Sequence, residues 1–166
     1  MDIIRSRRSV RKWKSKPVEK KQLDIIMEAA QQAPSAVNWQ PYRFVLVDDP
    51  EKLNLIAKAS GQPNLAKAPL LVVGVADPKR SPRWHVIDTA IALTLIMLAA
   101  YEAGLKGVWV GAFDDDSVKQ SLDIPKESVV AGILALGAPD QDPPARPRKS
   151  FEELFSRNSY KRPAKS

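Results

Sequence analysis

The sequence contains no cysteine and a single histidine, His85. Without cysteine the chain has no disulfide, no thiolate nucleophile and no cysteine-ligated zinc or iron–sulfur centre. One histidine leaves little from which to build a His-rich metal site or a Ser-His-Asp triad, and at a helix start it is expected to be structural. We therefore expect no metal site and assign no catalytic acid or base. Any redox chemistry has to be carried by a bound organic cofactor.

A long uncharged apolar run is also lacking. The longest apolar stretch, about Val86 to Ala103, includes Asp88 and Glu102, which favours a buried core helix over a membrane span. The first four residues are followed at once by basic residues, without the apolar core of a signal peptide. We expect a cytoplasmic protein with no membrane partner.

The length of 166 residues is that of a single domain, and a hydrophobic content of 44% is enough for a packed core. Fourteen prolines are more than average usage gives. Several lie near the C-terminus, which predicts an extended Pro/Arg-rich tail from about residue 139. The net charge of +7 favours an anionic partner: nucleic acid, a membrane surface or a phosphorylated small molecule. Much of this charge lies at the two chain ends, in residues 5–12 and 146–149.

Hydrophobic periodicity predicts an α+β fold with a central mixed sheet of about four strands surrounded by helices. A glycine-rich dinucleotide-binding loop after a strand is absent, which disfavours a Rossmann fold. The last predicted helix is capped by Asp115 or Asp116, and the helix that starts near Trp84 is expected to be the buried central one. The expected helices are about 18–32, 50–60, 84–103 and 116–122, and the expected strands are 42–47, 69–76, 108–110 and 129–137.

Four short segments could carry chemistry. Residues 7–11, Arg-Arg-Ser-Val-Arg, can surround a phosphate with charge-assisted hydrogen bonds. Residues 33–41 place Ser, Asn and Gln in a stiff loop that suits the edge of a planar heterocycle. Residues 107–113 contain a glycine that allows backbone to approach a flat ligand, and residues 146–149 hold two arginines extended. Each segment also has an ordinary interpretation: a solvated basic end, a turn, a strand end and a solubilising tail.

The order of these segments resembles the nitroreductase family. The shared pattern runs from Ile4 to about Glu153. It comprises Arg-Arg-Ser-x-Arg, Ala-Pro-Ser-x-x-Asn-x-Gln-Pro, Ala-Pro before the second strand, a long helix beginning with Asp88, Gly-Leu-x-Gly-x-Trp-x-Gly-x-Phe, and Leu-Gly-x-Pro followed by Arg-Pro-Arg-Lys. The Pro-Ser block in register with the basic start is the most specific part.

The resemblance implies an FMN site built from two chains. One subunit is expected to bind the phosphate and ribityl chain through Arg7, Arg8, Ser9, Arg11, Arg146 and Arg148. The other subunit is expected to contact the isoalloxazine and ribityl region through Pro34, Ser35, Ala36, Asn38 and Gln40. The backbone at Gly111 would lie close to the flavin ring, and Asn64 would bond its pyrimidine edge.

The resemblance further implies an intertwined homodimer, in which the tail with Phe151, Leu154 and Phe155 embraces the partner. The expected activity is ping-pong transfer of a hydride from NADH or NADPH to a small-molecule acceptor such as a nitroaromatic, a quinone or an enone. Two alternatives stay open. A family member of this kind could instead dehalogenate, process flavin or only bind it. A basic nucleic-acid-binding domain could use the same arginines, but its charges should lie along one exposed face, so no nucleic-acid partner is expected.

Five positions depart from patterns common in the family and bear on the substrate class. Thr94-Leu95 replaces a Gln-Asn pair of the central helix, and Val110 occupies a position that is acidic in some branches. Val37 and Trp39 replace smaller residues of the Pro-Ser loop, where Trp39 could narrow or line the substrate pocket.

Overall fold

The computed structural model describes residues 2–161; Met1 and the last five residues of the expected tail lie outside the described part. Four strands, six α-helices and two 3-10 turns alternate along these residues. Strands β1, β2, β3 and β4 span Tyr42–Val47, Leu70–Ala76, Lys106–Val110 and Val129–Gly137. The helices are α1 (Asp2–Ser6), α2 (Lys20–Gln31), α3 (Pro50–Ala59), α4 (His85–Glu102), α5 (Asp115–Ser121) and α6 (Phe151–Leu154), and the turns are η1 (Ala36–Asn38) and η2 (Pro63–Lys67).

The α+β class and the number of strands are confirmed, but the expectation of a mixed sheet is wrong. The strand order is β1-β2-β4-β3, and all three neighbouring pairs are antiparallel. Helix α4 returns the chain from β2 to β3 in the same direction, as a parallel crossover would. Strand β4 then inserts between these two strands, so that each pairs with an antiparallel neighbour. A parallel pairing remains at the isolated bridge between Ser9 and Gly107.

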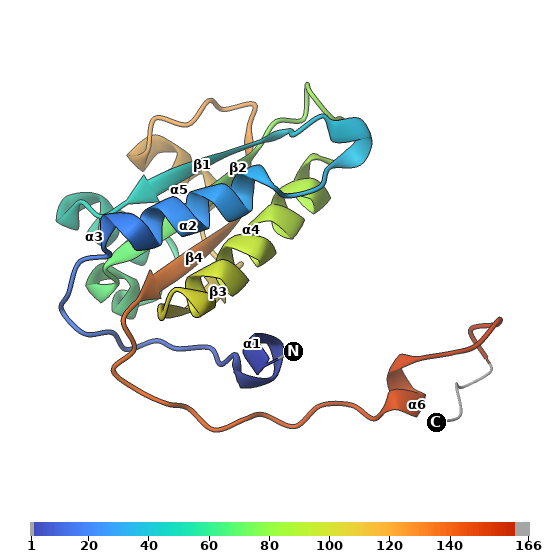
Figure 1. The fold of residues 1–166 in the computed structure, drawn as a ribbon. Helices are drawn as coiled ribbons and strands as arrows, with labels where there is room; N and C mark the ends of the chain where they lie inside the picture. Colours follow the sequence, from blue (N-terminus) through green and yellow to red (C-terminus); the bar gives the residue numbers. More distant parts are fainter. Residues whose placement is uncertain (1, 162–166) are drawn as a thin grey trace.

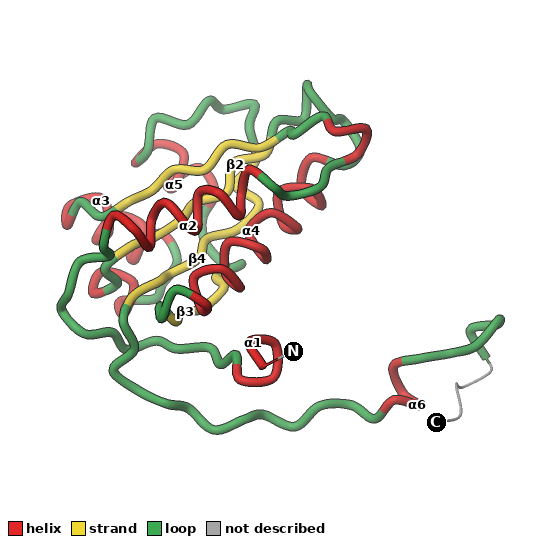
Figure 2. Tube along the Cα trace, in the orientation of Figure 1, coloured by secondary structure: helices red, strands yellow, loops and turns green. Residues whose placement is uncertain are grey.

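Helices cover both faces of this sheet (Figure 1). Helices α2 and α4 lie side by side on one face, where a cluster of buried residues joins them to β2 and β4. Helices α3 and α5 lie on the other face with a second cluster. Strand β2 is buried at every residue because it is covered on both faces. Beyond β4 the chain leaves this layered body as a long loop that ends in α6 (Figure 2).

Helix α4 differs from the buried central helix that its composition predicted. It is long and apolar enough to cross a membrane, and seven of its residues, including Asp88, are buried against the rest of the domain. Its opposite face is apolar but exposed, because Trp84, Ile87 and Ile91 follow at helical spacing with exposures of 38%, 51% and 39%. The domain therefore covers one face of this apolar helix and leaves the opposite apolar face exposed.

Local sequence signals located most elements well. Strands β1 and β4 have the predicted bounds, and α3 begins at Pro50 with Asp49 as its N-cap. The cap of α5 is Asp114, whose carboxylate accepts a hydrogen bond from Ser117 N at 2.8 Å, so the expectation of Asp115 or Asp116 is wrong by one residue. Four short elements were not predicted, α1, α6 and the two 3-10 turns, because three to five residues are too few to show periodicity.

Candidate functional site

The two basic ends of the chain meet at one cavity. A hollow of about 460 Å³ lies between the N-terminal segment and the extended loop after β4. Six arginines line it together with Ser9 and a proline pair: Arg5, Arg7, Arg8, Arg11, Arg146, Arg148, Pro143 and Pro144 are among its walls. Arg7, Arg8, Ser9 and Arg11 therefore face the same cavity as the late arginine pair, next to which the resemblance places them. Such a concentration of guanidinium groups suits a multiply charged anion.

The N-terminal segment is fixed to the sheet just where these arginines emerge. Val10 is fully buried, and its N–H donates to Gly107 O on β3 at 3.0 Å. A Cβ at Gly107 would lie 1.8 Å from Ala135 O, so that only glycine permits the strands to approach each other at this point. The segment is thus tied to the sheet between Ser9 and Arg11, two residues that line the cavity.

Tyr101, near the end of α4, holds the same segment from the side. Its hydroxyl donates to Arg8 O and accepts from Arg8 N at 3.1 Å. Burial raises the pKa of this hydroxyl above its ordinary value, against the opposing effects of the Arg8 backbone and of the Arg7 and Arg8 charges. The phenol therefore stays protonated and can continue to donate. The Arg8 guanidinium itself donates back to Arg5 O and Arg7 O, at 2.9 and 2.8 Å.

Asn64, in η2, lies in a neighbouring cavity of about 590 Å³ that Arg11 also lines. Its side-chain Nδ2 is buried and donates to no group within residues 2–161. A buried amide N–H2 without an acceptor is costly, so this atom fits a ligand that brings one. Lys67 lines the same cavity, one turn beyond Asn64. Sequence reasoning overlooked both Lys67 and Arg5, although the Asn-x-x-Lys spacing on a short turn was available as a signal.

The Pro-Ser loop lies elsewhere. It follows α2 and packs against the start of α4, where Ala36 N donates to the Asp88 carboxylate at 3.2 Å. Within the loop the Asn38 and Gln40 side chains are exposed and bonded to each other, Gln40 Nε2 donating to Asn38 Oδ1 at 3.1 Å. His85 lies one turn before Asp88, and its ring Nδ1 is hydrogen-bonded to Ser81 O at 2.8 Å. This contact within the chain suits a structural role.

Helix α4 separates the two halves of the expected site. Tyr101 marks the arginine end, and Asp88 marks the Pro-Ser loop thirteen residues earlier. At a rise of about 1.5 Å per residue the two anchor points are about 20 Å apart along the helix. Gly111 follows β3 at the end of that strand remote from Gly107. One chain therefore brings together Arg7, Arg8, Ser9, Arg11, Arg146 and Arg148, with Asn64 next to them, but not Pro34, Ser35, Ala36, Asn38 and Gln40.

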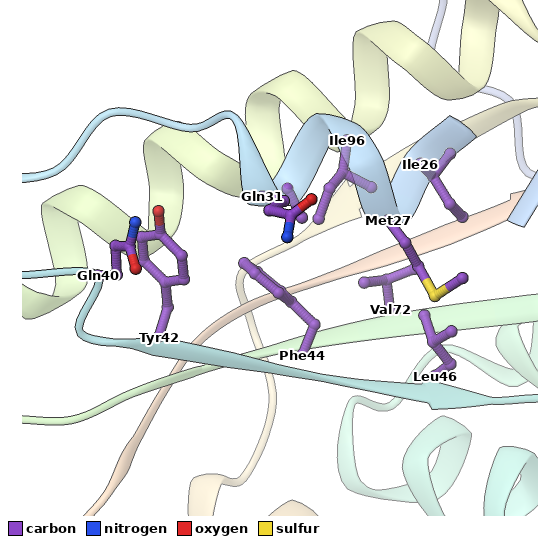
Figure 3. A pocket seen from close by; sticks show the side chains of 10 residues that line it. Ile26, Met27, Gln31, Gln40, Tyr42, Phe44, Leu46, Val72 and Ile96 are labelled. Atoms are coloured by element: carbon purple, nitrogen blue, oxygen red, sulfur yellow. The ribbon is translucent and has the colours of Figure 1, made fainter. Parts of the chain in front are cut away.

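A separate apolar groove of about 410 Å³ runs between α2 and the edge strand β1. Tyr42, Phe44 and Leu46 extend from β1 toward Met27 and Ile96 on the helices (Figure 3). Lysine and arginine do not occur among the described residues that line it. The groove therefore suits apolar contact, which distinguishes it from the arginine cavity.

This combination of motifs and fold matches known proteins. Residues 4–62 and 54–138 match the sequence model of the family described as "Nitroreductase family". The chain belongs to the nitroreductase family. The structural relationship extends over nearly the whole fold. An FMN-dependent nitroreductase from Clostridium difficile superposes with a TM-score of 0.85 at 31% identity, covering 95% of this chain and 98% of that one.

Other nitroreductase relatives carry names that refer to flavin and nicotinamide. The NADPH:FMN oxidoreductase of Vibrio harveyi, solved in complex with NAD⁺, superposes with a TM-score of 0.89 at 28% identity, covering 96% of this chain and 77% of that one. The FMN reductase (NAD(P)H) of Bacillus subtilis is 29% identical over 96% of this chain and 74% of its own length. The nitroreductase fold and family expected from the sequence are thereby confirmed.

Proposed function

We propose that this nitroreductase-family chain is an FMN-dependent oxidoreductase that takes a hydride from NADH or NADPH and passes it to a small-molecule acceptor. The observation that carries the proposal is the arginine cavity, in which two segments more than 130 residues apart in sequence converge on one anion site. The names of the Vibrio harveyi and Bacillus subtilis relatives support the choice of FMN and of a nicotinamide reductant.

The residues present fit FMN at two points. The phosphate is a dianion, and the arginine cavity offers guanidinium groups from both chain ends together with the Ser9 hydroxyl. Next to it, the buried Nδ2 of Asn64 would find an acceptor in a flavin carbonyl, and Lys67 would add a positive charge. Bound FMN would supply the hydride transfer itself.

The chain's own contribution is binding and orientation. Arg7, Arg11, Arg146 and Arg148 would hold the phosphate, while Tyr101 keeps the Arg8 backbone in place. The amides of Asn38 and Gln40, presented by a second chain, would bond the polar edge of the ring system. A ping-pong order follows if nicotinamide and acceptor use the same exposed face in turn, and nitroaromatics or quinones are planar enough to do so.

We propose that the working form is a homodimer. The arginine cavity and the Pro-Ser loop lie about 20 Å apart along α4 in one chain, so a flavin that touches both needs two chains. The exposed apolar face of α4 offers a surface for the second copy. The C-terminal tail offers a second apolar surface for the partner, since Phe151, Leu154 and Phe155 are 70%, 57% and 53% exposed.

The first experiment is a visible spectrum of the purified protein, identification of the flavin released on heating, and titration of the stripped protein with FMN and riboflavin. We expect FMN at about one per chain and oxidation of NADH or NADPH with a quinone or nitroaromatic acceptor. Arg7→Ala should weaken FMN binding by about tenfold or more, because a charge-assisted hydrogen bond is lost, and should leave riboflavin binding unchanged.

Arg43→Ala serves as the control, since Arg43 is an exposed arginine of β1 outside the cavity. A protein that takes up neither flavin would refute the proposal. FMN binding without any nicotinamide oxidation would instead favour a dehalogenating, flavin-processing or flavin-storing member of the family.

A further inference from the structure

The Pro-Ser loop has an unusual backbone. Val37, Asn38 and Gln40 have φ angles of +50°, +55° and +49°, which lie in the left-handed region. Asparagine tolerates this region, but a β-branched residue such as Val37 is disfavoured there. The Val37 side chain is 83% exposed, so packing of that side chain does not hold the loop in this conformation. Other contacts must do so.

Four hydrogen bonds join the backbone of residues 33–40 to side chains. Ser35 Oγ accepts from Gln40 N at 2.8 Å, which closes the turn. The Tyr42 hydroxyl donates to Ala33 O at 3.0 Å, and Arg80 donates to Trp39 O. The fourth is the bond that Ala36 N donates to the Asp88 carboxylate at 3.2 Å. Ala36 is the first residue of η1 and directly precedes Val37.

Asp88 differs from these other partners because it is a carboxylate with only 4% of its surface exposed. A buried carboxylate is costly unless its charge is compensated. Its position in α4, one turn after the N-cap Trp84, places it near the positive end of the helix dipole. The Ala36 N–H adds a directed, charge-assisted hydrogen bond. The contact is therefore stronger than a surface bond, and it ties the loop to the rigid core.

The Asp88 charge also affects the pKa of Tyr42, whose hydroxyl is another hydrogen-bond partner of the loop. Burial raises the pKa of the Tyr42 hydroxyl above its ordinary value, and the Asp88 charge raises it further. The phenol thus stays protonated and donates to Ala33 O. Asp88 and Tyr42 together fix the backbone on both sides of Pro34 and Ser35.

We propose that Asp88 is a positioning residue of the flavin site: by binding Ala36 N it keeps Val37, Asn38 and Gln40 in the left-handed conformation that presents the Asn38 and Gln40 amides to the flavin of the partner subunit. The inference rests on the proposed function for the ligand, but the action of Asp88 on the loop is independent of it. Because the loop is assigned to the ring and not to the phosphate, loss of Asp88 should weaken FMN and riboflavin alike.

The test combines hydrogen exchange of the flavin-free protein with flavin titration. In Asp88→Ala we expect the peptide covering residues 33–40 to exchange about tenfold faster, and FMN and riboflavin affinities to fall by the same factor, about tenfold or more. Asp88→Asn keeps an acceptor for Ala36 N and should recover part of both effects. At saturating FMN the visible circular dichroism of the bound flavin should change in Asp88→Ala.

Asp49→Ala is the matched control, because Asp49 is also a carboxylate that accepts a backbone N–H, from Lys52 at 2.9 Å, but at the start of α3. It should leave the exchange of residues 33–40 and both flavin affinities unchanged. If Asp88→Ala does not fold, Ala36→Pro removes the N–H instead; the extended backbone of Ser35, with φ −145° and ψ 160°, accepts a following proline.

Three results would overturn the proposal. Unchanged exchange of residues 33–40 in Asp88→Ala would show that the carboxylate does not hold the loop. A loosened loop with unaltered flavin affinities would show that the loop is not part of the flavin site. A selective loss of FMN over riboflavin would place Asp88 with the phosphate instead. Failure of the unsubstituted protein to bind any flavin is a different result, which refutes the proposed function and leaves the exchange measurement interpretable.

Discussion

At the scale of single residues, Gly107 of β3 and Gly111 just after it differ in how much space their surroundings leave for a side chain. A Cβ at Gly107 would meet backbone, Ala135 O at 1.8 Å, whereas a Cβ at Gly111 would meet only the Trp109 side chain, at 3.7 Å. Neither residue has a left-handed φ, so space alone distinguishes them. Packing within the chain accounts for Gly107 and not for Gly111, and the second glycine is free to serve a ligand.

This difference gives a paired prediction. Gly107→Ala should lower the free energy of unfolding by roughly 3 kcal/mol, because strand backbones must move apart. Gly111→Ala should leave stability unchanged within about 0.5 kcal/mol but weaken both FMN and riboflavin if backbone here lies against the flavin ring. Urea unfolding and flavin titration of both variants check this. Equal stability losses would contradict the packing argument, and undiminished flavin binding in Gly111→Ala would remove Gly111 from the site.

The two partly buried tyrosines predict how stability depends on alkaline pH. Burial raises the folded-state pKa of Tyr42 and Tyr101 above the ordinary 10.0. The unfolded chain therefore releases these protons first, and the free energy of unfolding should fall as the pH rises above about 10. A Tyr42→Phe/Tyr101→Phe double variant should show a shallower fall between about pH 9 and pH 11 in urea titrations. Tyr160, 96% exposed, supplies the control, and Tyr160→Phe should reproduce the wild-type slope.

At the scale of elements, helix α4 connects the core of the domain with the N-terminal segment and the Pro-Ser loop. One face packs on β2, β4 and α2, and its two ends carry Tyr101 and Asp88, which anchor the two segments that we propose to bind the flavin. Its remaining face is apolar and exposed at Trp84, Ile87 and Ile91. Such a face on a helix that is otherwise a core element is expected to be covered by another protein surface.

Charge placed on this face should separate the subunits. We expect Ile87→Glu to shift the protein from dimer to monomer in sedimentation and to release bound flavin, because desolvating a carboxylate in an apolar interface is strongly unfavourable. Leu55→Glu is the matched control, since Leu55 is 43% exposed on α3, on the other side of the sheet. A dimer that survives Ile87→Glu with its flavin bound would show that this face of α4 is not the interface.

At the scale of the whole molecule, the arrangement predicts that each flavin site draws on two chains. Consider a heterodimer of one Arg7→Ala chain and one Asn38→Ala chain. One of its sites carries both substitutions, and the other carries neither. We therefore expect differently tagged, co-purified heterodimers to bind one FMN with wild-type affinity, while each parent homodimer binds FMN weakly at both sites. Titration followed by flavin fluorescence measures this, and the absence of a recovered site would show that each site is contained in one chain.

The sequence alone determined much of this protein. Period-two and period-3.6 patterns, together with caps at Asp49 and Gly104, fix the strands and long helices because these signals are local. The order of the motifs identified the family, and that resemblance predicted that the arginines of both chain ends bind one phosphate. The predicted roles of the site residues toward FMN stay predictions, supported by the arginine cavity and by the buried amide of Asn64.

Only the tertiary structure decided the rest, because it depends on contacts between residues far apart in the chain. Insertion of β4 between β2 and β3 makes the sheet antiparallel, which no local pattern reveals. Likewise, the sequence of an apolar helix is the same whether its own chain covers one or both of its faces. Only the folded structure therefore shows that one apolar face of α4 is exposed. The bond from Ala36 to Asp88 joins residues 52 positions apart, and only the folded chain shows that a buried carboxylate holds the Pro-Ser loop.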